Sequence, residues 1–330
     1  MRIKRYMALL TAFLLCITGL SGCRNTSSPE QTTKTTTTAS GQAVAKGETW
    51  TFTDALERSV SIQPPKTVVS LYGSFAETWT LAGGTLAGTT QDAVEERGMK
   101  LSDDVKIIGT VKTPDTERVA ALNPDFVILS ADIESHVQLN DMLTDMQIPH
   151  AYFQVDTYQD YLDMLWGFCR LTGRSDLYEK NGAAVEKDIQ DVLQKVSTEK
   201  ERPSVLLIRA FSTGAKAKGA DNLAGVILEE LQADNIVERH ASLLEDLSIE
   251  AIIQEDPDYI FVSIMGSDDQ KALDALKEGI QANPAWNELT AIKNDRYYVL
   301  PKELFHYKPN ARWGESYAYL AKILYPEAMG

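Results

Sequence analysis

Two stretches of the chain share one order of apolar and polar positions. Glu117–Leu129 opens with a glutamate, continues with apolar residues at helical spacing, reaches Pro124 and ends in an unbroken apolar run. Glu250–Val262 repeats that order around Pro257. Because the residue before a proline disfavours the α region, each stretch predicts a short helix, a Pro-Asp turn and a buried parallel strand. The equal spacing from glutamate to proline favours an internal duplication into two lobes, although such units are also common in other α/β proteins.

The remaining apolar pattern predicts strands and helices in each half of the chain. Thr49–Phe52 and Ser59–Ile62 alternate apolar and polar residues, which indicates a small hairpin. Val68–Leu71 and Val205–Ile208 are apolar runs of strand length, and each predicts the first core strand of a lobe. The other predicted strands are Lys106–Gly109, Ala151–Val155 and Tyr297–Leu300; the other predicted helices are one that carries Phe75 and Trp79 and ends at Gly83, then Val137–Met146, Thr157–Gly173, Leu223–Leu231, Asp268–Ala282 and Asn310–Leu324, with a polar loop at Phe211–Asp221.

Five apolar residues recur at helical spacing between the two halves. They predict a helix from about Ser175 to Val196 with one apolar stripe. At 1.5 Å per residue this helix spans roughly 30 Å, the width of a small domain. Two lobes joined by a helix open less freely than two lobes joined by coil. The stripe consists of Val185, Ile189, Val192, Leu193 and Val196.

The first 22 residues predict a targeting segment. Three basic residues stand within the first five positions, and Met7–Leu20 is an apolar run too short for a comfortable transmembrane helix. The run ends in Leu-Ser-Gly-Cys23, which resembles the lipobox of bacterial lipoproteins, in which the cysteine carries a lipid after cleavage. An ordinary signal peptide with a chance cysteine is the alternative. Residues 24–47 are mostly Ser, Thr, Gln, Lys and Gly, and they predict a flexible tether between a membrane and a folded body.

Charge and cysteine usage agree with a membrane-anchored protein outside the cytoplasm. Without the leader's three positive charges the formal charge falls from −15 to −18, which argues against nucleic acid as a partner. Cys16 leaves with the leader, Cys23 is the predicted lipidation site, and Cys169 lies among apolar residues, which is typical of a buried, inert thiol. The predicted organisation is a signal peptide (1–22), a lipidated tether (23–47), an N-terminal α/β lobe (48–173), a joining helix (174–200) and a C-terminal α/β lobe (201–330).

The sequence offers no convincing catalytic or metal-binding motif. Gly214–Gly219 has the glycine spacing of a phosphate loop, but Ala-Asp follows it in place of Lys-Ser/Thr. Ser74 lacks the flanking glycines of a nucleophile elbow. The histidines are scattered, with no pair at helical spacing, so we expect no zinc site, no resident cofactor and no enzyme activity. The four histidines are His136, His150, His240 and His306.

Basic and aromatic residues gather in the loops that follow the predicted strands. In open α/β sheets, ligands bind beyond the carboxyl ends of the strands. Lysines and arginines there would pair with an anionic ligand, and aromatic side chains would pack against its rings. The alternative is that these loops are simply polar and do not converge. The candidate ligand-binding residues are Tyr72, Ser74, Lys112, Arg209, Phe211, Lys216, Lys218, Met265, Lys302, His306, Tyr307, Arg312 and Trp313, and the same loops carry Gly73, Val111, Gly266 and Lys308.

Taken together, the order of motifs resembles the substrate-binding lipoproteins of ABC importers, in the class III group that binds ferric siderophores, cobalamin or haem. The resemblance covers about Thr49–Pro326. It implies two Rossmann-like α/β lobes joined by one long α-helix, with the ligand in a cleft between them. Its marks are Thr51-Phe-Thr-Asp-Ala, Val68-Val-Ser-Leu with Glu77, Ile108-Gly-Thr, both glutamate units, Asn283-Pro-Ala-Trp286, Asp295-Arg-Tyr-Tyr-Val299 and Leu-Tyr-Pro326.

The same resemblance implies a docking role for the two repeated glutamates. In that family one glutamate at the tip of each lobe contacts arginines of the two permease subunits. By motif position those residues are Glu117 and Glu250. The alternative is that both are helix N-terminal glutamates stabilised by the helix dipole, and the two roles are compatible. The implied partners are an ABC permease dimer with its ATPase subunits, and the carrier is expected to be a monomer.

For the ligand, the resemblance leaves several chemistries open. Cobalamin binders place an aromatic residue before the first glutamate unit, where this chain has Val111-Lys112, and this difference favours an anion such as a ferric siderophore. Haem, with Tyr72, Met265 or His306 as axial donors, and a corrinoid are the alternatives. An extracytoplasmic enzyme on a similar two-lobed fold is the alternative of a different class, and it should show a titratable pair with shifted pKa values in the cleft.

Overall fold

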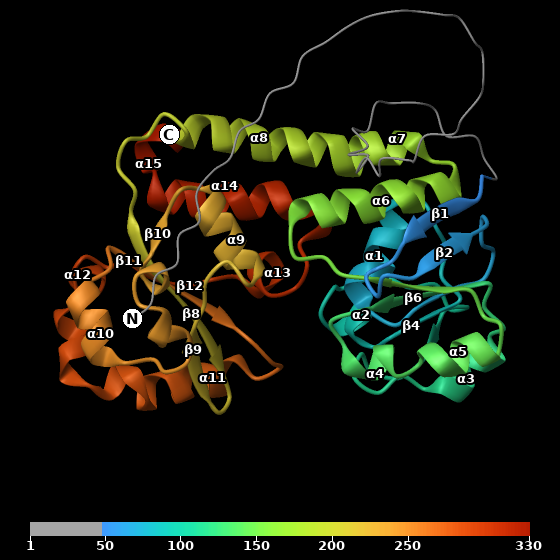
Figure 1. The fold of residues 1–330 in the computed structure, drawn as a ribbon, viewed down its shortest axis with the longest axis horizontal. Coiled ribbons are helices and arrows are strands. Elements are labelled where there is room, and N and C mark those ends of the chain that lie inside the picture. The colour runs from blue at the N-terminus through green and yellow to red at the C-terminus, as the bar shows by residue number, and fades with distance from the viewer. Residues whose placement is uncertain (1–47) are drawn as a thin grey trace, which may run out of the picture. The chain divides into compact units, whose positions relative to one another are not determined.

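The computed structural model describes residues 48–330, which fall within one compact unit, Ala43–Gly330. The predicted signal peptide, the tether and Cys23 lie outside the described residues. Within residues 48–330, no helix is both long enough and apolar enough to cross a membrane. Figure 1 shows two lobes, each built on a sheet, with helices along one side of both.

The first lobe contains a five-stranded parallel sheet in the order β5-β4-β3-β6-β7. A separate hairpin, β1 paired antiparallel with β2, precedes this sheet as predicted. The predicted helix Val137–Met146 is instead two short helices, α4 and α5, which break between Val137 and Asn140. The elements are β1 Trp50–Thr53, β2 Ser59–Ile62, β3 Val68–Ser70, α1 Gly73–Leu81, β4 Gly88–Thr89, α2 Asp92–Glu95, β5 Lys106–Ile107, α3 Thr116–Ala121, β6 Phe126–Ser130, α4 Glu134–Val137, α5 Asn140–Asp145, β7 His150–Phe153 and α6 Tyr158–Thr172.

The second lobe contains a sheet in the order β10-β8-β11-β12, with β9 paired to β8 from outside that path. The predicted polar loop Phe211–Asp221 is wrong in part, because Gly214–Ala217 forms β9 and folds back antiparallel on β8. Ala215, Lys216 and Ala217 do alternate apolar and polar, but the run is short and its apolar residues are only alanines, so backbone pairing with β8 makes the strand. The elements are β8 Ser204–Phe211, β9 Gly214–Ala217, α9 Leu223–Glu230, β10 Asp234–Asn235, α10 Ile249–Glu255, β11 Tyr259–Ile264, α11 Asp269–Glu278, α12 Thr290–Lys293, β12 Tyr297–Val299, α13 Lys302–Phe305, α14 Trp313–Leu324 and α15 Pro326–Met329.

The predicted repeat is present in both lobes, and its similarity extends to the backbone. Asn123 and Asp256 precede the two prolines, and both have left-handed φ values, 45° and 42°. After each proline, an aspartate carboxylate accepts a backbone N–H from the start of the neighbouring strand: Asp125 from Thr67 at 2.8 Å, and Asp258 from Ser204 at 3.0 Å. Each Pro-Asp turn therefore joins a short helix to a buried strand and fixes that strand against β3 in the first lobe or β8 in the second.

The helix between the lobes has the predicted range but contains a π turn. It consists of α7 (Ser175–Tyr178), the π turn Glu179–Ala183 and α8 (Ala184–Val196). Within the π turn, the Asn181 carbonyl accepts the Tyr161 hydroxyl at 2.7 Å, and its amide donates to the Leu81 carbonyl at 2.9 Å. These bonds tie the start of the helix to α6 and α1. Of the predicted stripe, Leu193 alone is half-buried and the rest is buried.

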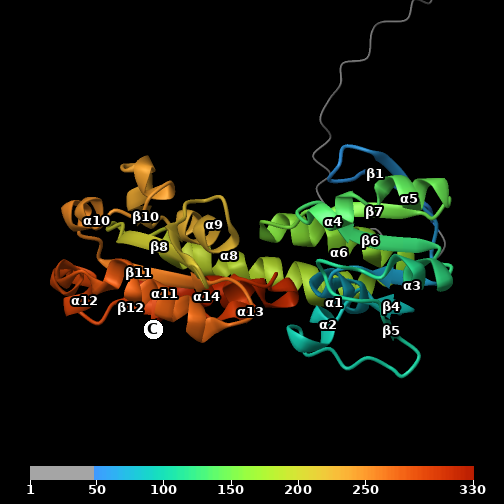
Figure 2. The same ribbon diagram turned by 90° about the horizontal axis from the view of Figure 1, so that it is seen from below.

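Helix α14 packs along α8 and completes the layer that spans both lobes (Figures 1 and 2). At Gly314 the two helices come so close that an added Cβ would lie 2.9 Å from the Asp188 Cβ. Further along, the Tyr317 hydroxyl donates to Glu230 of α9 at 2.6 Å, which fixes α14 to the second lobe. One hydrophobic cluster runs through this layer, from Phe126 in the first sheet to Phe261 in the second.

Gly314→Ala should therefore destabilise the protein, although alanine is the better helix former by about 1 kcal/mol. The added methyl must push α14 away from a backbone-proximal atom of α8, and overpacking of this kind costs about 1–3 kcal/mol. Urea unfolding measures the change, with the exposed neighbour Glu315→Ala as control. A Gly314→Ala variant as stable as the native chain would show that the helices are not in such close contact.

Candidate ligand-binding site

Carboxylates occupy the carboxyl ends of the strands in the first sheet. Asp92 follows β4, Asp132 follows β6 and Asp156 follows β7. Glu96 lies one residue beyond α2, and Tyr72 follows β3 at the start of α1. We call Asp92, Glu96, Asp132 and Asp156 the acidic edge. None of these four carboxylates is among the residues predicted from the sequence, although the aspartates come two or three residues after each strand.

Basic residues occupy the corresponding ends of the second sheet. Arg209 lies near the end of β8, and Lys302 and Lys308 follow β12. Met265, whose side chain is 45% exposed, follows β11. We call Arg209, Lys302 and Lys308 the basic edge. All three come from the loops or strand ends where the sequence predicted ligand-binding residues.

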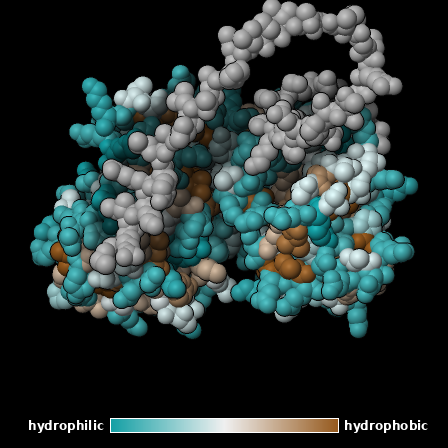
Figure 3. Space-filling view, in the orientation of Figure 1, coloured by the Kyte–Doolittle hydropathy of each residue, from teal (hydrophilic) through white to brown (hydrophobic). Residues whose placement is uncertain are grey.

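The two edges face each other across the lobes. The Lys308 ammonium lies 3.2 Å from a carboxylate oxygen of Asp156 and 3.8 Å from one of Asp132. The Asn310 amide donates to the Ser74 carbonyl at 2.9 Å and to the Glu77 carboxylate at 2.6 Å. In both ribbon views α2 faces α13, and the space-filling view shows a furrow between the lobes (Figure 3). Both sets of strand ends therefore border one space.

Lys302 anchors the loop that carries the aromatic part of the basic edge. Its ammonium donates to the Gly266 carbonyl at 2.5 Å and pairs with Asp269 at 2.8 Å. The same ammonium lies 5.4 Å from the centre of the Tyr307 ring, whose centre is 5.2 Å from that of His306. Burial, and then the charges of Lys302 and Arg209, lower the pKa of His306 to about 4. His306 is therefore neutral at physiological pH.

Arg209 is the member of the basic edge that has a buried donor atom without a hydrogen-bond acceptor among the described residues. Burial lowers its pKa, and its buried Nε has no hydrogen-bond acceptor among residues 48–330. Lys216 stands directly opposite Arg209 in the β8–β9 hairpin. Like charges directly opposite each other in a sheet are destabilising, so this pair favours an anion beside it.

The acidic edge has a buried acceptor atom, on Asp92, without a hydrogen-bond donor among the described residues. Asp92 is 6% exposed; one carboxylate oxygen accepts the Gly73 N–H at 2.7 Å, and the other is buried without a donor among the described residues. The buried hydroxyls of Thr89 and Thr90 also lack partners there. Burial and then Asp92 raise the pKa of both Glu96 and Tyr72. Phenolate formation at Tyr72 is accordingly disfavoured.

Several predicted ligand-binding residues are placed away from this space or are already paired. Trp313 is fully buried in the core between the lobes, so its placement in the cleft is wrong, and Ser74 is buried in the first turn of α1. Lys218 pairs with Asp221, and Arg312 pairs with Glu315 at 2.8 Å. The other predicted residues are exposed or half-buried, with no contact that brings them to either edge: Lys112 in the loop after β5, and Phe211 at the end of β8.

The repeated glutamates occupy equivalent positions. Glu117 and Glu250 are each the second residue of their helix, α3 and α10, and both are exposed. The N-cap side chains Asp115 and Ser248 accept the backbone N–H that the helix start leaves unpaired. Hydrogen bonds from its own backbone and from Ser248 lower the pKa of Glu250. Both carboxylates are thus exposed to a partner while their helices are capped by other residues.

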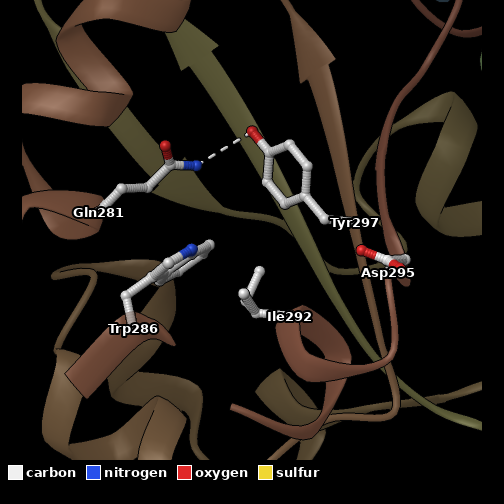
Figure 4. A pocket seen from close by; sticks show the side chains of 5 residues that line it. All are labelled: Gln281, Trp286, Ile292, Asp295 and Tyr297. Carbon is white, nitrogen blue, oxygen red and sulfur yellow. Dashed lines mark hydrogen bonds between the residues drawn. The ribbon is translucent and has the colours of Figure 1, made fainter. Parts of the chain in front are cut away.

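A separate pocket of about 420 Å³ lies elsewhere in the second lobe (Figure 4). Trp286, Ile292, Asp295 and Tyr297 line it together with Gln281, whose amide donates to the Tyr297 hydroxyl at 3.1 Å. Tyr297 is the first residue of β12, so this pocket borders the amino end of the strand. It is therefore distinct from the space between the two edges.

His136 fixes the loop that carries Lys112. Its Nδ1 accepts the Ser130 N–H at 3.1 Å, and its Nε2 donates to the Val111 carbonyl at 2.8 Å. The ring is fully buried, and burial lowers its pKa to about 4, against the opposing effect of the Val111 bond. Neither nitrogen is available to a ligand.

Residues 48–330 hold no group of three or more His, Cys, Asp or Glu side chains that could bind a metal ion.

Two lobes with facing strand edges occur in binding proteins and in two-lobed enzymes, and comparison with known families identifies the class. The periplasmic binding protein family matches residues 68–304, which is most of the chain. The chain therefore belongs to the periplasmic binding protein family. Its mixed α/β fold with parallel sheets is the two-lobed fold of that family.

Relatives and solved structures of similar fold extend over most of the chain. A Bacillus subtilis (strain 168) protein with the provisional name ABC transporter substrate-binding lipoprotein YhfQ is 25% identical over 81% of this chain and 85% of its own. The Fe(3+)-citrate-binding protein YfmC of the same organism is 23% identical over 89% of each chain. The structure of Staphylococcus aureus IsdE in complex with heme matches with a TM-score of 0.65 and 16% identity, over 78% of this chain and 98% of IsdE.

The buried state of His136 predicts how stability depends on pH. Between pH 6.5 and about 4 the unfolded chain binds a proton at this residue and the folded chain does not, so stability falls as the pH falls through that range. At 1.36 kcal/mol per pKa unit, the loss approaches roughly 3 kcal/mol. Unfolding in urea at pH 7.0, 5.5 and 4.5 should show a shallower pH dependence for His136→Gln than for the native chain.

His240→Gln, at a side chain that is 28% exposed, is the matched control. Equal pH slopes for the native chain and His136→Gln would show that His136 titrates normally in the folded protein.

Proposed function

We propose that this chain captures an iron chelate, specifically a ferric siderophore, on the outer face of the cytoplasmic membrane and delivers it to an ABC permease. The observation that carries the proposal is the pair of facing strand edges, which Lys308 of one lobe and Asp156 of the other join by an ion pair at 3.2 Å. Relatives support the iron chemistry: YfmC is named for Fe(3+)-citrate, and IsdE was solved with heme. The name of YhfQ supports a lipoprotein of an ABC transporter.

A carrier fits this site better than an enzyme does. The relatives are binding proteins, which supports a binding role at the level of the family. The edge residues are held by partners suited to rigid placement, such as Lys302 by Gly266 and Asp269. An oxygen-rich anionic chelate would meet the guanidinium of Arg209 in the geometry that carboxylates and phosphates use.

Haem is the second candidate, and His306 is the observation that favours it. The lowered pKa of His306 leaves a neutral imidazole, the form that ligates iron, near the exposed Met265 loop. Burial raises the pKa of Tyr72, which disfavours the phenolate that a tyrosine axial ligand requires. Of the axial donors that the sequence suggested, His306 and the exposed Met265 therefore fit better than Tyr72.

Delivery would use the two capped helix starts. Glu117 and Glu250 are exposed at equivalent positions of a duplicated unit, which suits a partner with two similar subunits. Carboxylates paired with basic sockets set register and orientation more than affinity. Anchoring would use Cys23, which lies outside the described residues, with a lipid keeping the carrier near its permease.

Neutralising Arg209 should weaken binding of an anionic ferric chelate. We expect Arg209→Gln to raise the Kd for ferric citrate about tenfold, since a charge-assisted contact is worth about 1.4 kcal/mol or more. Binding to the native chain should also weaken when salt is raised, because screening reduces the attraction. Isothermal titration calorimetry measures both. Arg312→Gln is the matched control, since Arg312 already pairs with Glu315.

Tight binding of neutral cobalamin, with no response to ferric catecholates or hydroxamates, would overturn the siderophore assignment and leave the fold assignment intact.

Removing the two glutamates should stop transport and leave ligand binding unchanged. Exposed glutamates at helix starts contribute only about 0.3–1 kcal/mol to stability, so Glu117→Ala and Glu250→Ala should fold and bind normally. Uptake of iron chelate by cells should fall for each single variant and nearly vanish for the double variant. Glu134→Ala, an exposed glutamate in the first turn of α4, is the control. Normal uptake by the double variant would show that the two glutamates do not dock on the permease and serve only as negative charges at the helix starts.

A further inference from the structure

One short segment of the second lobe contacts the first lobe at two places. Lys308 and Asn310 lie between α13 and α14. The Lys308 ammonium is 3.2 Å from a carboxylate oxygen of Asp156, after β7, and 3.8 Å from one of Asp132, after β6. The Asn310 amide donates to a backbone carbonyl in the first turn of α1 at 2.9 Å. The stretch from Lys308 to Asn310, which we call the crossing segment, therefore joins the two lobes beyond their strand ends.

The backbone of the crossing segment is held with the second lobe. The two residues before Lys308 donate their backbone N–H groups to the Lys302 carbonyl, at 2.9 and 2.8 Å. Pro309 follows, and its ring restricts the backbone. Asn310 is 1% exposed and has a φ of 53°, in the left-handed region that asparagine tolerates better than most residues. The second lobe thus sets the position of Lys308, and the lysine side chain crosses to the first lobe.

Two carboxylates of the first lobe are placed to receive this ammonium. One oxygen of Asp156 pairs with Lys308, and the other accepts the Gln154 amide at 2.8 Å, which orients the carboxylate. Burial raises the pKa of Asp132, and the charge of Lys308 opposes that rise. The Lys308 side chain is 14% exposed. Because water screens it less, a pair partly removed from solvent attracts more strongly than a fully exposed pair.

We propose that Lys308 is a positioning residue for ligand binding: through Asp156 and Asp132 it holds the two strand edges at the separation at which one ligand contacts both. This inference rests on the proposed function and adds the residue that sets the width of the site. The layer of α8 and α14 joins the lobes along one side, so a small bend of that layer separates the strand edges on the other side. Breaking the ion pair lowers the fraction of molecules with the edges at the binding distance, and the apparent affinity falls with that fraction.

The sign of two charge changes distinguishes this role from a direct contact between Lys308 and the ligand. A direct contact alone predicts that Lys308→Met weakens binding of an anionic chelate and that Asp132→Asn/Asp156→Asn, which removes two repelling charges, strengthens it. A positioning role predicts that both variants raise the Kd for ferric citrate, each about fivefold if the competent fraction falls to about a fifth. The combined triple variant should bind no more weakly than either, because all three changes break one interaction. Isothermal titration calorimetry measures these values.

The separation of the lobes is a second readout, and it needs no ligand. Spin labels on p-acetylphenylalanine, introduced in place of Asp145 on α5 and Lys277 on α11, leave the native cysteines unmodified. Both positions are exposed, and both helices lie on the side of the lobes away from the α8–α14 layer (Figure 1). In Lys308→Met and in Asp132→Asn/Asp156→Asn, the distance measured by double electron–electron resonance should lengthen by about 2 Å or more, the size of a lobe rearrangement.

Lys187→Met is the matched control for both measurements. It removes the same charge from an ion pair with Asp191 that lies within α8, so the distance and the Kd should keep their native values.

The outcomes separate this inference from the function on which it rests. Unchanged distances in both variants, or changes of opposite sign in the Kd, would overturn the positioning role and leave the proposed function standing. If the native chain binds neither ferric citrate nor the ferric hydroxamate ferrioxamine B, the proposed function fails, and the distances alone decide whether Lys308 sets the separation of the lobes.

Discussion

The packing of α14 on α8 is the contact on which the site depends. The two helices approach so closely at Gly314 that no side chain fits beside Asp188, and their apolar faces belong to one cluster that reaches both sheets. At the other end, the π turn binds α8 to the first lobe through Asn181. Because both lobes are attached to one helical layer, their strand ends are held facing each other, which is why residues as distant in sequence as Asp156 and Lys308 can form an ion pair.

Much of the fold could be predicted from local signals in the sequence. The prolines after the glutamate units, the unbroken apolar runs and the Thr157–Asp160 capping box are all read from a few neighbouring residues, and each marks an element that the structure contains. The joining helix was predictable because its apolar residues recur at the spacing of an α-helix. Its π turn was not, because that turn depends on Tyr161 and Leu81, which lie in other elements.

The candidate site was less predictable, for the same physical reason. Trp313 is an aromatic residue of the kind that often lines ligand-binding sites, and only long-range packing shows that it lies in the core. The strand β9 has only a short alanine–lysine alternation between glycines, too weak to predict a strand, and it is held by pairing with β8. The acidic edge was the largest omission: a carboxylate after a strand looks like ordinary solvated loop, and its role becomes visible only when the opposite lobe is seen to present bases to it.

The hydrophobic cluster that both lobes share has a further consequence for the lifetime of the protein. Since residues of both sheets belong to one buried cluster, melting either lobe would expose apolar surface of the other, and unfolding is expected to be one cooperative event. Partly unfolded forms, the species that proteases cut, are then rare. A ligand that touches both edges adds its binding free energy to the whole molecule, so the loaded carrier outlasts the empty one.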